Sequence, residues 1–108
     1  MSNINLKPEY LIMVRKILAE YVPEAEVWAY GSRVNGDAHD ASDLDLVVRN
    51  PDNLTLPQKN INELKDAFAE SNLPILVDIL DWARLPESFH ERIARCHEVI
   101  QKPVGISR

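Results

Sequence analysis

The spacing of hydrophobic residues divides the chain into helical and extended segments. Over residues 8–21 the apolar side chains recur every three or four positions, which predicts an amphipathic helix with a proline in its first turn, ended by Pro23. The same spacing predicts a second helix over residues 57–71, with Thr55 as its cap, and a last helix over residues 86–101. Each helix carries one apolar stripe, so each is expected to pack on a common core.

Three extended segments alternate with these helices. Residues 26–30 and 43–49 are joined by a polar loop and are expected to pair antiparallel. Residues 75–80 are apolar except for Asp78, as is typical of a buried strand, and the helix before them predicts a crossover connection. The order helix, strand, strand, helix, strand, helix therefore predicts an α+β fold with helices packed on a small mixed β-sheet.

The turn after the first strand and the start of the second strand carry the most evident chemistry. Gly31 and Ser32 form the turn, and Asp43 and Asp45 follow after ten intervening residues. Side chains at i and i+2 of a strand share a face, so the two aspartates are neighbouring like charges, which is unfavourable unless a cation lies between them. A glycine lets backbone N–H groups approach a phosphate, and a serine hydroxyl adds a donor. This combination is suited to handling a nucleoside triphosphate.

These motifs resemble the signature of the nucleotidyltransferases with the DNA-polymerase-beta-like fold. The context Tyr30-Gly31-Ser32-Arg33 is most similar to the minimal nucleotidyltransferases, the MNT-domain proteins. The motif spans residues 31–45, and the order of strands and helices extends the resemblance to one domain over residues 1–102, with residues 103–108 as a loose tail. The alternative is a polar loop between two strands that happens to hold two acids.

The resemblance implies a two-metal magnesium site with ATP as the nucleotide donor. A nucleoside monophosphate passes to an acceptor hydroxyl and pyrophosphate is released, while two cations clamp the attacking and leaving oxygens. Arg33 stabilises phosphate charge in this interpretation, and is otherwise a solvated loop residue or part of a salt bridge. The predicted catalytic and metal-binding residues are Asp43, Asp45 and Asp78, and the predicted nucleotide-binding residues are Gly31, Ser32 and Arg33.

Asp78 is the third acid assigned to the site, because a carboxylate inside an apolar strand is costly without a cation or a donor. In the resembled family a third carboxylate comes from a neighbouring strand, helps to hold the second ion and assists deprotonation of the acceptor. Asp81 is the alternative, although it is better placed to cap the turn at Trp82, and a site without a third ligand is also open. His39, in the loop between the two motif halves, either approaches the phosphates or is an ordinary loop residue.

Composition argues against several other functions. The net charge is -5 without a cluster of lysine and arginine, which does not suit a protein that grips duplex DNA or RNA, although it permits binding of one nucleotide. No apolar run approaches the roughly 20 residues of a membrane span, and the N-terminus does not read as a signal peptide. The single cysteine, Cys96, excludes an internal disulfide, so a cytoplasmic protein away from the membrane is expected.

The last predicted helix contains further candidate residues. Cys96 falls in its apolar stripe and is expected to be a small core residue. His90 and His97 fall on one face, and surface or partner-facing histidines are favoured over a metal site because no further ligand has the required spacing. Trp82, Leu85 and Phe89 are either part of a partner surface or part of the core.

The residues themselves do not indicate the acceptor. Larger relatives carry a second domain that completes the substrate groove, and none is expected here, so a second copy or a separate protein would complete the site. The resemblance implies a HEPN-domain RNase toxin as partner in a hetero-oligomer, with this chain as the antitoxin that transfers AMP to a tyrosine of the toxin or binds it. The alternatives are a small-molecule transferase, as among aminoglycoside nucleotidyltransferases, and a non-catalytic binding module.

Overall fold

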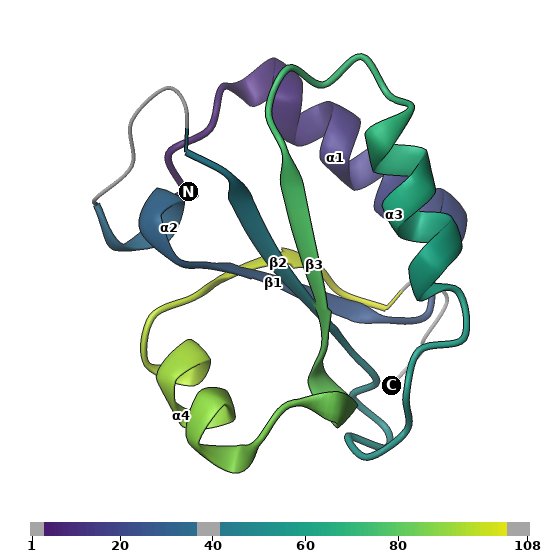
Figure 1. Cartoon of the computed structure of the whole chain (residues 1–108), viewed down its shortest axis with the longest axis vertical. Helices are drawn as coiled ribbons and strands as arrows, with labels where there is room; N and C mark the ends of the chain where they lie inside the picture. The colour runs from purple at the N-terminus through teal and green to yellow at the C-terminus, as the bar shows by residue number, and fades with distance from the viewer. Residues whose placement is uncertain (1–3, 37–41, 104–108) are drawn as a thin grey trace.

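The chain folds into a four-stranded β-sheet with helices on both faces (Figure 1). The computed structural model describes residues 4–36 and 42–103. The strand order is β3-β2-β1-β4, with β1 antiparallel to β2 and β4, and β2 parallel to β3. The predicted mixed sheet and crossover are therefore confirmed. The elements are α1 (Pro8–Tyr21), β1 (Glu26–Tyr30), α2 (Ser32–Asn35), β2 (Leu44–Arg49), α3 (Ile61–Ala69), β3 (Val77–Asp81), the 3-10 turn η1 (Trp82–Arg84), α4 (Glu87–Arg95) and β4 (Glu98–Gln101).

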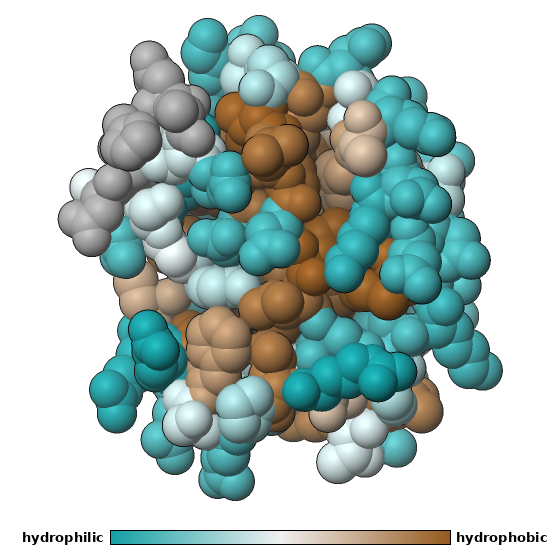
Figure 2. Space-filling view, in the orientation of Figure 1, coloured by the Kyte–Doolittle hydropathy of each residue, from teal (hydrophilic) through white to brown (hydrophobic). Residues whose placement is uncertain are grey.

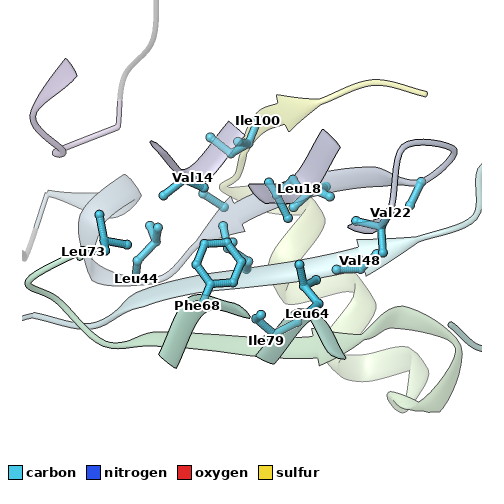
Figure 3. Packing of buried hydrophobic residues seen from close by; sticks show 14 residues of the cluster. Val14, Leu18, Val22, Leu44, Val48, Leu64, Phe68, Leu73, Ile79 and Ile100 are labelled. Atoms are coloured by element: carbon cyan, nitrogen blue, oxygen red, sulfur yellow. The ribbon is translucent and has the colours of Figure 1, made fainter. Parts of the chain in front are cut away.

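The main hydrophobic core lies between the sheet and the helices α1 and α3. Alternate residues of β2 point into it, namely Leu44, Leu46 and Val48, as the period of two predicts. Leu18 of α1 and Phe68 of α3 meet them from the helical side, and Figure 3 shows Phe68 among side chains from α1, β2 and β3. This face of the sheet is therefore filled with hydrocarbon, and the opposite face is the one available for chemistry.

The opposite face is only partly covered, and Figure 1 shows α4 on that side. Val47, Trp82 and Ile93 form a second, smaller cluster of buried residues there. Trp28 and Trp82 meet edge to face, and the guanidinium carbon of Arg49 lies 4.2 and 4.5 Å from their ring centroids. These contacts fix α4 and η1 over the middle of the sheet and leave the beginning of β3 exposed.

The second half of the predicted last helix is wrong, because a fourth strand replaces it. Helix α4 ends at Arg95, and the backbone of Cys96 is already extended, with φ −148° and ψ 97°. The residues that follow pair with the otherwise open edge of β1 as β4. An unpaired edge strand presents a row of backbone donors and acceptors, and β4 satisfies those of β1.

Gln101 secures the new strand at its end. Its side chain is buried, and Nε2 donates hydrogen bonds to the carbonyl oxygens of Val22 and Ala25 at 2.8 and 2.9 Å. These two carbonyls belong to the turn between α1 and β1. The bonds therefore join the last strand to the turn before β1, where the Val22 carbonyl oxygen also accepts a hydrogen bond from the Ala25 N–H at 3.1 Å.

The second predicted helix is real but shorter, since α3 occupies residues 61–69. Thr55 is not its cap: the Thr55 hydroxyl donates to Asn53 Oδ1 at 2.7 Å, and Asn60 holds the N-cap position. Strand β3 begins two residues later than predicted and includes Asp81. The segment between β2 and α3 thus forms turns instead of an extra helical turn.

The predictions for the residues around the end of α4 need correction. Cys96 is exposed and lies beyond the helix, so it is not a core residue. His97 also lies beyond the helix and stacks on Trp28 with ring centroids 3.8 Å apart, whereas His90 stacks on Trp82 at 4.0 Å. The two histidines therefore do not share a helix face. Trp82 is buried and Phe89 is half-buried, which favours the core interpretation for both.

The surface also carries hydrophobic residues, and Figure 2 shows them in the middle of one face, over β3 and the segment before it. Leu76, directly before β3, is 74% exposed. Within the described ranges no helix is both long and apolar enough to cross a membrane. His39 and all of the predicted tail except Pro103 lie outside the described residues.

Candidate active site

Three polar residues form a row across β1, β2 and β3. Tyr30 pairs with Asp45 on the antiparallel neighbour, and Asp45 pairs with Asp78 on the parallel one. Paired residues on neighbouring strands face the same side, so all three side chains lie on the face that α4 covers only in part. Because neighbouring strands are about 4.8 Å apart, the two carboxylates are adjacent groups, although they come from distant parts of the chain.

The glycine turn touches this row directly. Gly31 has φ 82° and ψ −156°, a conformation that side chains disfavour. A Cβ atom at Gly31 would collide with Oδ2 of Asp45. Ser32 follows as the first residue of α2 and is partly exposed. Glycine is therefore required at this position both for its backbone angles and because the turn lies against the carboxylate.

The electrostatics of the row favour a cation. The pKa of Asp45 is raised, mainly by burial and further by the negative charges of Asp78 and Asp43. Burial, followed by the charges of Asp45 and Asp78, also raises the pKa of the Tyr30 phenol, which stays protonated and able to donate a hydrogen bond. A positive ion among these carboxylates would relieve the repulsion that raises the pKa of Asp45.

The donor atoms of the row fit a magnesium ion. Carboxylate oxygens are preferred ligands of this cation, and the row offers Asp45 and Asp78, with the exposed Asp43 close to Asp45 just before β2. Across residues 4–36 and 42–103, however, no three acidic, histidine or cysteine side chains converge closely enough to form a complete ligand set. Magnesium usually keeps waters and phosphate oxygens among its ligands, so a partial protein set is compatible with it. The three-carboxylate ligand set stays a prediction.

Arg33 lies in the same region but faces backbone carbonyls. It is 7% exposed, which excludes the solvated alternative. Its Nε and one terminal nitrogen donate to the carbonyl oxygen of Ser42 at 3.0 and 2.9 Å, and the other terminal nitrogen donates to the carbonyl oxygen of Asn5 at 2.7 Å. Ser42 directly precedes Asp43. Arg33 therefore connects the glycine turn to the beginning of β2. A contact between Arg33 and a phosphate stays a prediction.

Comparison with known proteins places this geometry in a family. The pattern of the polymerase beta nucleotidyltransferase family matches residues 13–103. The chain belongs to this family. It is 44% identical over 101 residues to the probable protein adenylyltransferase MntA of Haemophilus influenzae, a match that covers 94% of this chain and 87% of the relative.

Solved structures share the fold of this nucleotidyltransferase. A toxin–antitoxin structure with AMP-PNP aligns with a TM-score of 0.68 at 23% identity, covering 91% of this chain and 76% of the other. An MntA–HepT toxin–antitoxin structure aligns with a TM-score of 0.64 at 18% identity, covering 89% and 73%. At these identities the likeness supports the polymerase-beta-like α+β fold.

Replacing Arg33 by methionine is expected to lower both stability and nucleotidyl transfer. The change leaves the carbonyls of Ser42 and Asn5 without these donors, which costs about 2 kcal/mol or more in the free energy of unfolding. It also releases Ser42, the residue directly before Asp43, so kcat should fall roughly tenfold. Urea unfolding and initial rates measure the two effects. Arg33→Lys should keep only part of the wild-type stability and rate, because an ammonium group cannot reproduce the planar fork of donors.

The control for this change is Arg95→Met, on the exposed side of the last turn of α4. A surface change of this kind should alter stability by less than about 0.5 kcal/mol. A full rate in the Arg33→Met variant would show that the position of residue 42 does not matter for catalysis.

Two further residues are placed by the structure alone. The sequence motif includes Tyr30 only as context. Its place beside Asp45 follows from the antiparallel register of β1 and β2, which the alternation of side chains along the two strands could have suggested.

Asp81 is buried on the other face of the sheet, where Oδ2 accepts a hydrogen bond from the Gln58 N–H at 2.9 Å and lies 3.4 Å from Arg84 Nε. It makes no side-chain cap bond at η1, so the predicted capping role is wrong.

Proposed function

We propose that this nucleotidyltransferase is an Mg²⁺- and ATP-dependent protein adenylyltransferase that transfers AMP to a tyrosine of a HEPN-domain RNase toxin, and thereby acts as its antitoxin. The observation that carries the proposal is the contact of the glycine turn with Asp45, beside Asp78. Similarity to a probable protein adenylyltransferase supports a protein as the acceptor. The shared fold with toxin–antitoxin structures, one of them with AMP-PNP, supports the donor and the kind of partner.

The residues at the turn bind the phosphates of ATP, and the acids at the start of β2 bind the cation. The backbone amides at Gly31 and the Ser32 hydroxyl bind the β- and γ-phosphates, while Asp43 and Asp45 hold the cation that neutralises the triphosphate. When bound, Mg²⁺ supplies Lewis-acid stabilisation of charge on the phosphoryl oxygens. Tyr30, whose phenol stays protonated beside Asp45 and Asp78, keeps a neutral donor next to the anionic groups of the row.

We assign Asp78 to the binding of the acceptor, because its side chain is exposed at the beginning of the edge strand β3. Its carboxylate orients the acceptor tyrosine and takes its proton. The phenolic oxygen attacks the α-phosphorus, the bond from that phosphorus to the bridging oxygen of the β-phosphate breaks, and pyrophosphate leaves. The products are the adenylylated tyrosine, pyrophosphate and a proton on the protein that passes to solvent.

The partner completes the site from outside the sheet. The acids lie on a face that α4 covers only in part, and hydrophobic residues such as Leu76 are exposed near the beginning of β3. A toxin seated over this region would bring its tyrosine towards Asp78 and exclude water. We therefore propose a hetero-oligomer in the cytoplasm, where ATP and an RNase toxin both occur, without a role in binding duplex nucleic acid.

The test is the intact mass of a HEPN-domain protein, which we expect to be encoded next to this chain. Incubation with this protein and Mg·ATP should add whole adenylate units to the partner, and replacing its acceptor tyrosine by phenylalanine should prevent the addition. Omission of Mg²⁺ should do the same. An unchanged mass combined with tight binding would support a non-catalytic antitoxin instead, and adenylylation of an aminoglycoside but not of the partner would support a small-molecule transferase.

A further inference from the structure

A hollow of about 290 Å³ opens beside the glycine turn, between the end of β1, α2 and α4. Tyr30 and Gly31 form the wall that it shares with the candidate active site. Phe89, Arg92 and Cys96 line it from α4 and the residue that follows. Neither the motifs nor the proposed roles of the acids assign a function to this hollow.

The lining of the hollow is suited to a flat ring with polar edges. The rings of Tyr30 and Phe89 meet edge to face, with centroids 6.1 Å apart and planes at 85°. The guanidinium carbon of Arg92 lies 5.8 Å from the Phe89 centroid. Aromatic faces bind every nucleobase by stacking, and a neighbouring arginine adds donors for its ring nitrogens or carbonyl oxygens.

We propose that this hollow binds the nucleobase of the donor nucleotide. The inference rests on the proposed function, because it takes the triphosphate to lie on the glycine turn and the acids. Gly31 borders both the row and the hollow, so a base joined to the α-phosphate through one ribose reaches from one to the other. Pockets that bury whole drug-sized ligands measure about 300–1,000 Å³, so this hollow is matched to a ring system and not to an entire nucleoside triphosphate.

Two larger hollows are less suitable. One of about 460 Å³ includes Lys7, Tyr10 and Arg33, and it borders α1 on the other side of the sheet. Another of about 410 Å³ lies at the far ends of β1 and β2, beside Tyr21 and Asn50. Neither includes a residue of the Tyr30, Asp45 and Asp78 row, so neither is adjacent to the reacting phosphate.

The first experiment compares Mg·ATP with Mg·tripolyphosphate by isothermal titration calorimetry. Tripolyphosphate has the phosphates without the base, so it should bind the turn and the acids more weakly than ATP. Phe89→Ala should weaken ATP binding about tenfold or more, through lost stacking, and leave tripolyphosphate binding unchanged. Phe89→Leu, which keeps an apolar side chain in the smaller core cluster, should show most of the same loss. Glu91→Gln, an exposed change on the same helix, is the control.

The second experiment uses Cys96, the one cysteine of the chain, as a reporter inside the hollow. N-ethylmaleimide should alkylate this exposed thiol readily in the free protein. Saturating Mg·ATP should slow the reaction about tenfold, because the base covers the thiol, whereas saturating Mg·tripolyphosphate should not. The alkylated protein should still bind tripolyphosphate but bind ATP no more tightly than tripolyphosphate.

The outcomes separate this inference from the proposed function. If ATP and tripolyphosphate bind equally well and neither protects Cys96, the base lies elsewhere and the inference is wrong, while the triphosphate site stands. Protection of Cys96 by the partner toxin but not by ATP would assign the hollow to the acceptor and also overturn the inference. Absence of binding by both ligands would overturn the proposed function together with it.

Discussion

Replacing Asp45 by asparagine is expected to abolish AMP transfer, with a fall in kcat of about 10³-fold or more. Asp45 is the central carboxylate of the row, next to Asp78 and in contact with the glycine turn. The neutral amide is a poor ligand for Mg²⁺, and several kcal/mol of transition-state stabilisation depends on that ion. The measurement is the rate at which adenylate is added to the partner. Asp52→Asn, which removes the same charge from an exposed turn, is the matched control and should transfer AMP at the full rate.

The same substitution should have the opposite effect on the stability of the metal-free protein. Burial and the charges of Asp78 and Asp43 raise the pKa of Asp45 in the folded state, so the folded protein binds its proton more tightly than the unfolded chain. Stability is then lost as the pH rises from near 3.8, the ordinary pKa, through the raised value. The amide of the Asp45→Asn variant would carry no such charge and should remove this part of the pH dependence, although Asp43, Asp78 and Tyr30 remain near that position.

Thermal unfolding in a chelating buffer between pH 4 and pH 8 checks this expectation. Wild type should lose stability relative to the asparagine variant as the pH rises, and added Mg²⁺ should stabilise wild type but not the variant. A variant that is less stable than wild type at neutral pH without Mg²⁺ would mean that the Asp45 carboxylate has favourable partners, and that the repulsion in the row is not real.

Replacing Gly31 by alanine is expected to lower AMP transfer about 100-fold and the free energy of unfolding by about 1–3 kcal/mol. The alanine must adopt φ near +82°, a conformation that costs energy for any residue with a side chain. Its Cβ would also collide with Oδ2 of Asp45. Either the turn or the carboxylate must move, and a displacement of about 1 Å in such a site can cost 10²-fold in rate.

Gly36→Ala separates the two causes. Gly36 also has a positive φ, of 95°, but a Cβ there would meet nothing within 4 Å. This variant should therefore lose a similar amount of backbone stability and keep most of its transfer rate. Chemical denaturation gives the stabilities, and the partner adenylylation assay gives the rates. Equal loss of rate in the two variants would show that backbone strain, and not contact with Asp45, is what the glycine turn contributes.

Local sequence patterns specified several elements residue by residue. The stripe over residues 8–21 matches the bounds of α1, and the segment 26–30 matches those of β1. In these segments the period of the apolar residues and the flanking prolines agree, so the local preference and the tertiary environment select the same structure. The alternation in β2 likewise places Leu44, Leu46 and Val48 on one face, which the structure shows to be the core face.

The second half of the predicted last helix shows where this reasoning ends. Ile100 continues the helical spacing of Phe89 and Ile93, so the pattern alone favours one long helix. The chain instead adds β4, because β1 has an edge to be paired and Gln101 reaches two carbonyls of the turn before β1. Both partners are remote in sequence, so their contribution is invisible to a local pattern.

The order of amino acids is enough to identify the chemical groups of this nucleotidyltransferase: a glycine–serine turn, an acid pair at the start of a strand, and a third acid in an apolar strand. The folded chain was needed to learn that Asp45 lies between Tyr30 and Asp78, that Arg33 holds Ser42 directly before Asp43, and that α4 lines a hollow beside Gly31. Strand alternation is a property of consecutive residues, whereas strand register and helix docking are set by contacts between segments far apart in the chain.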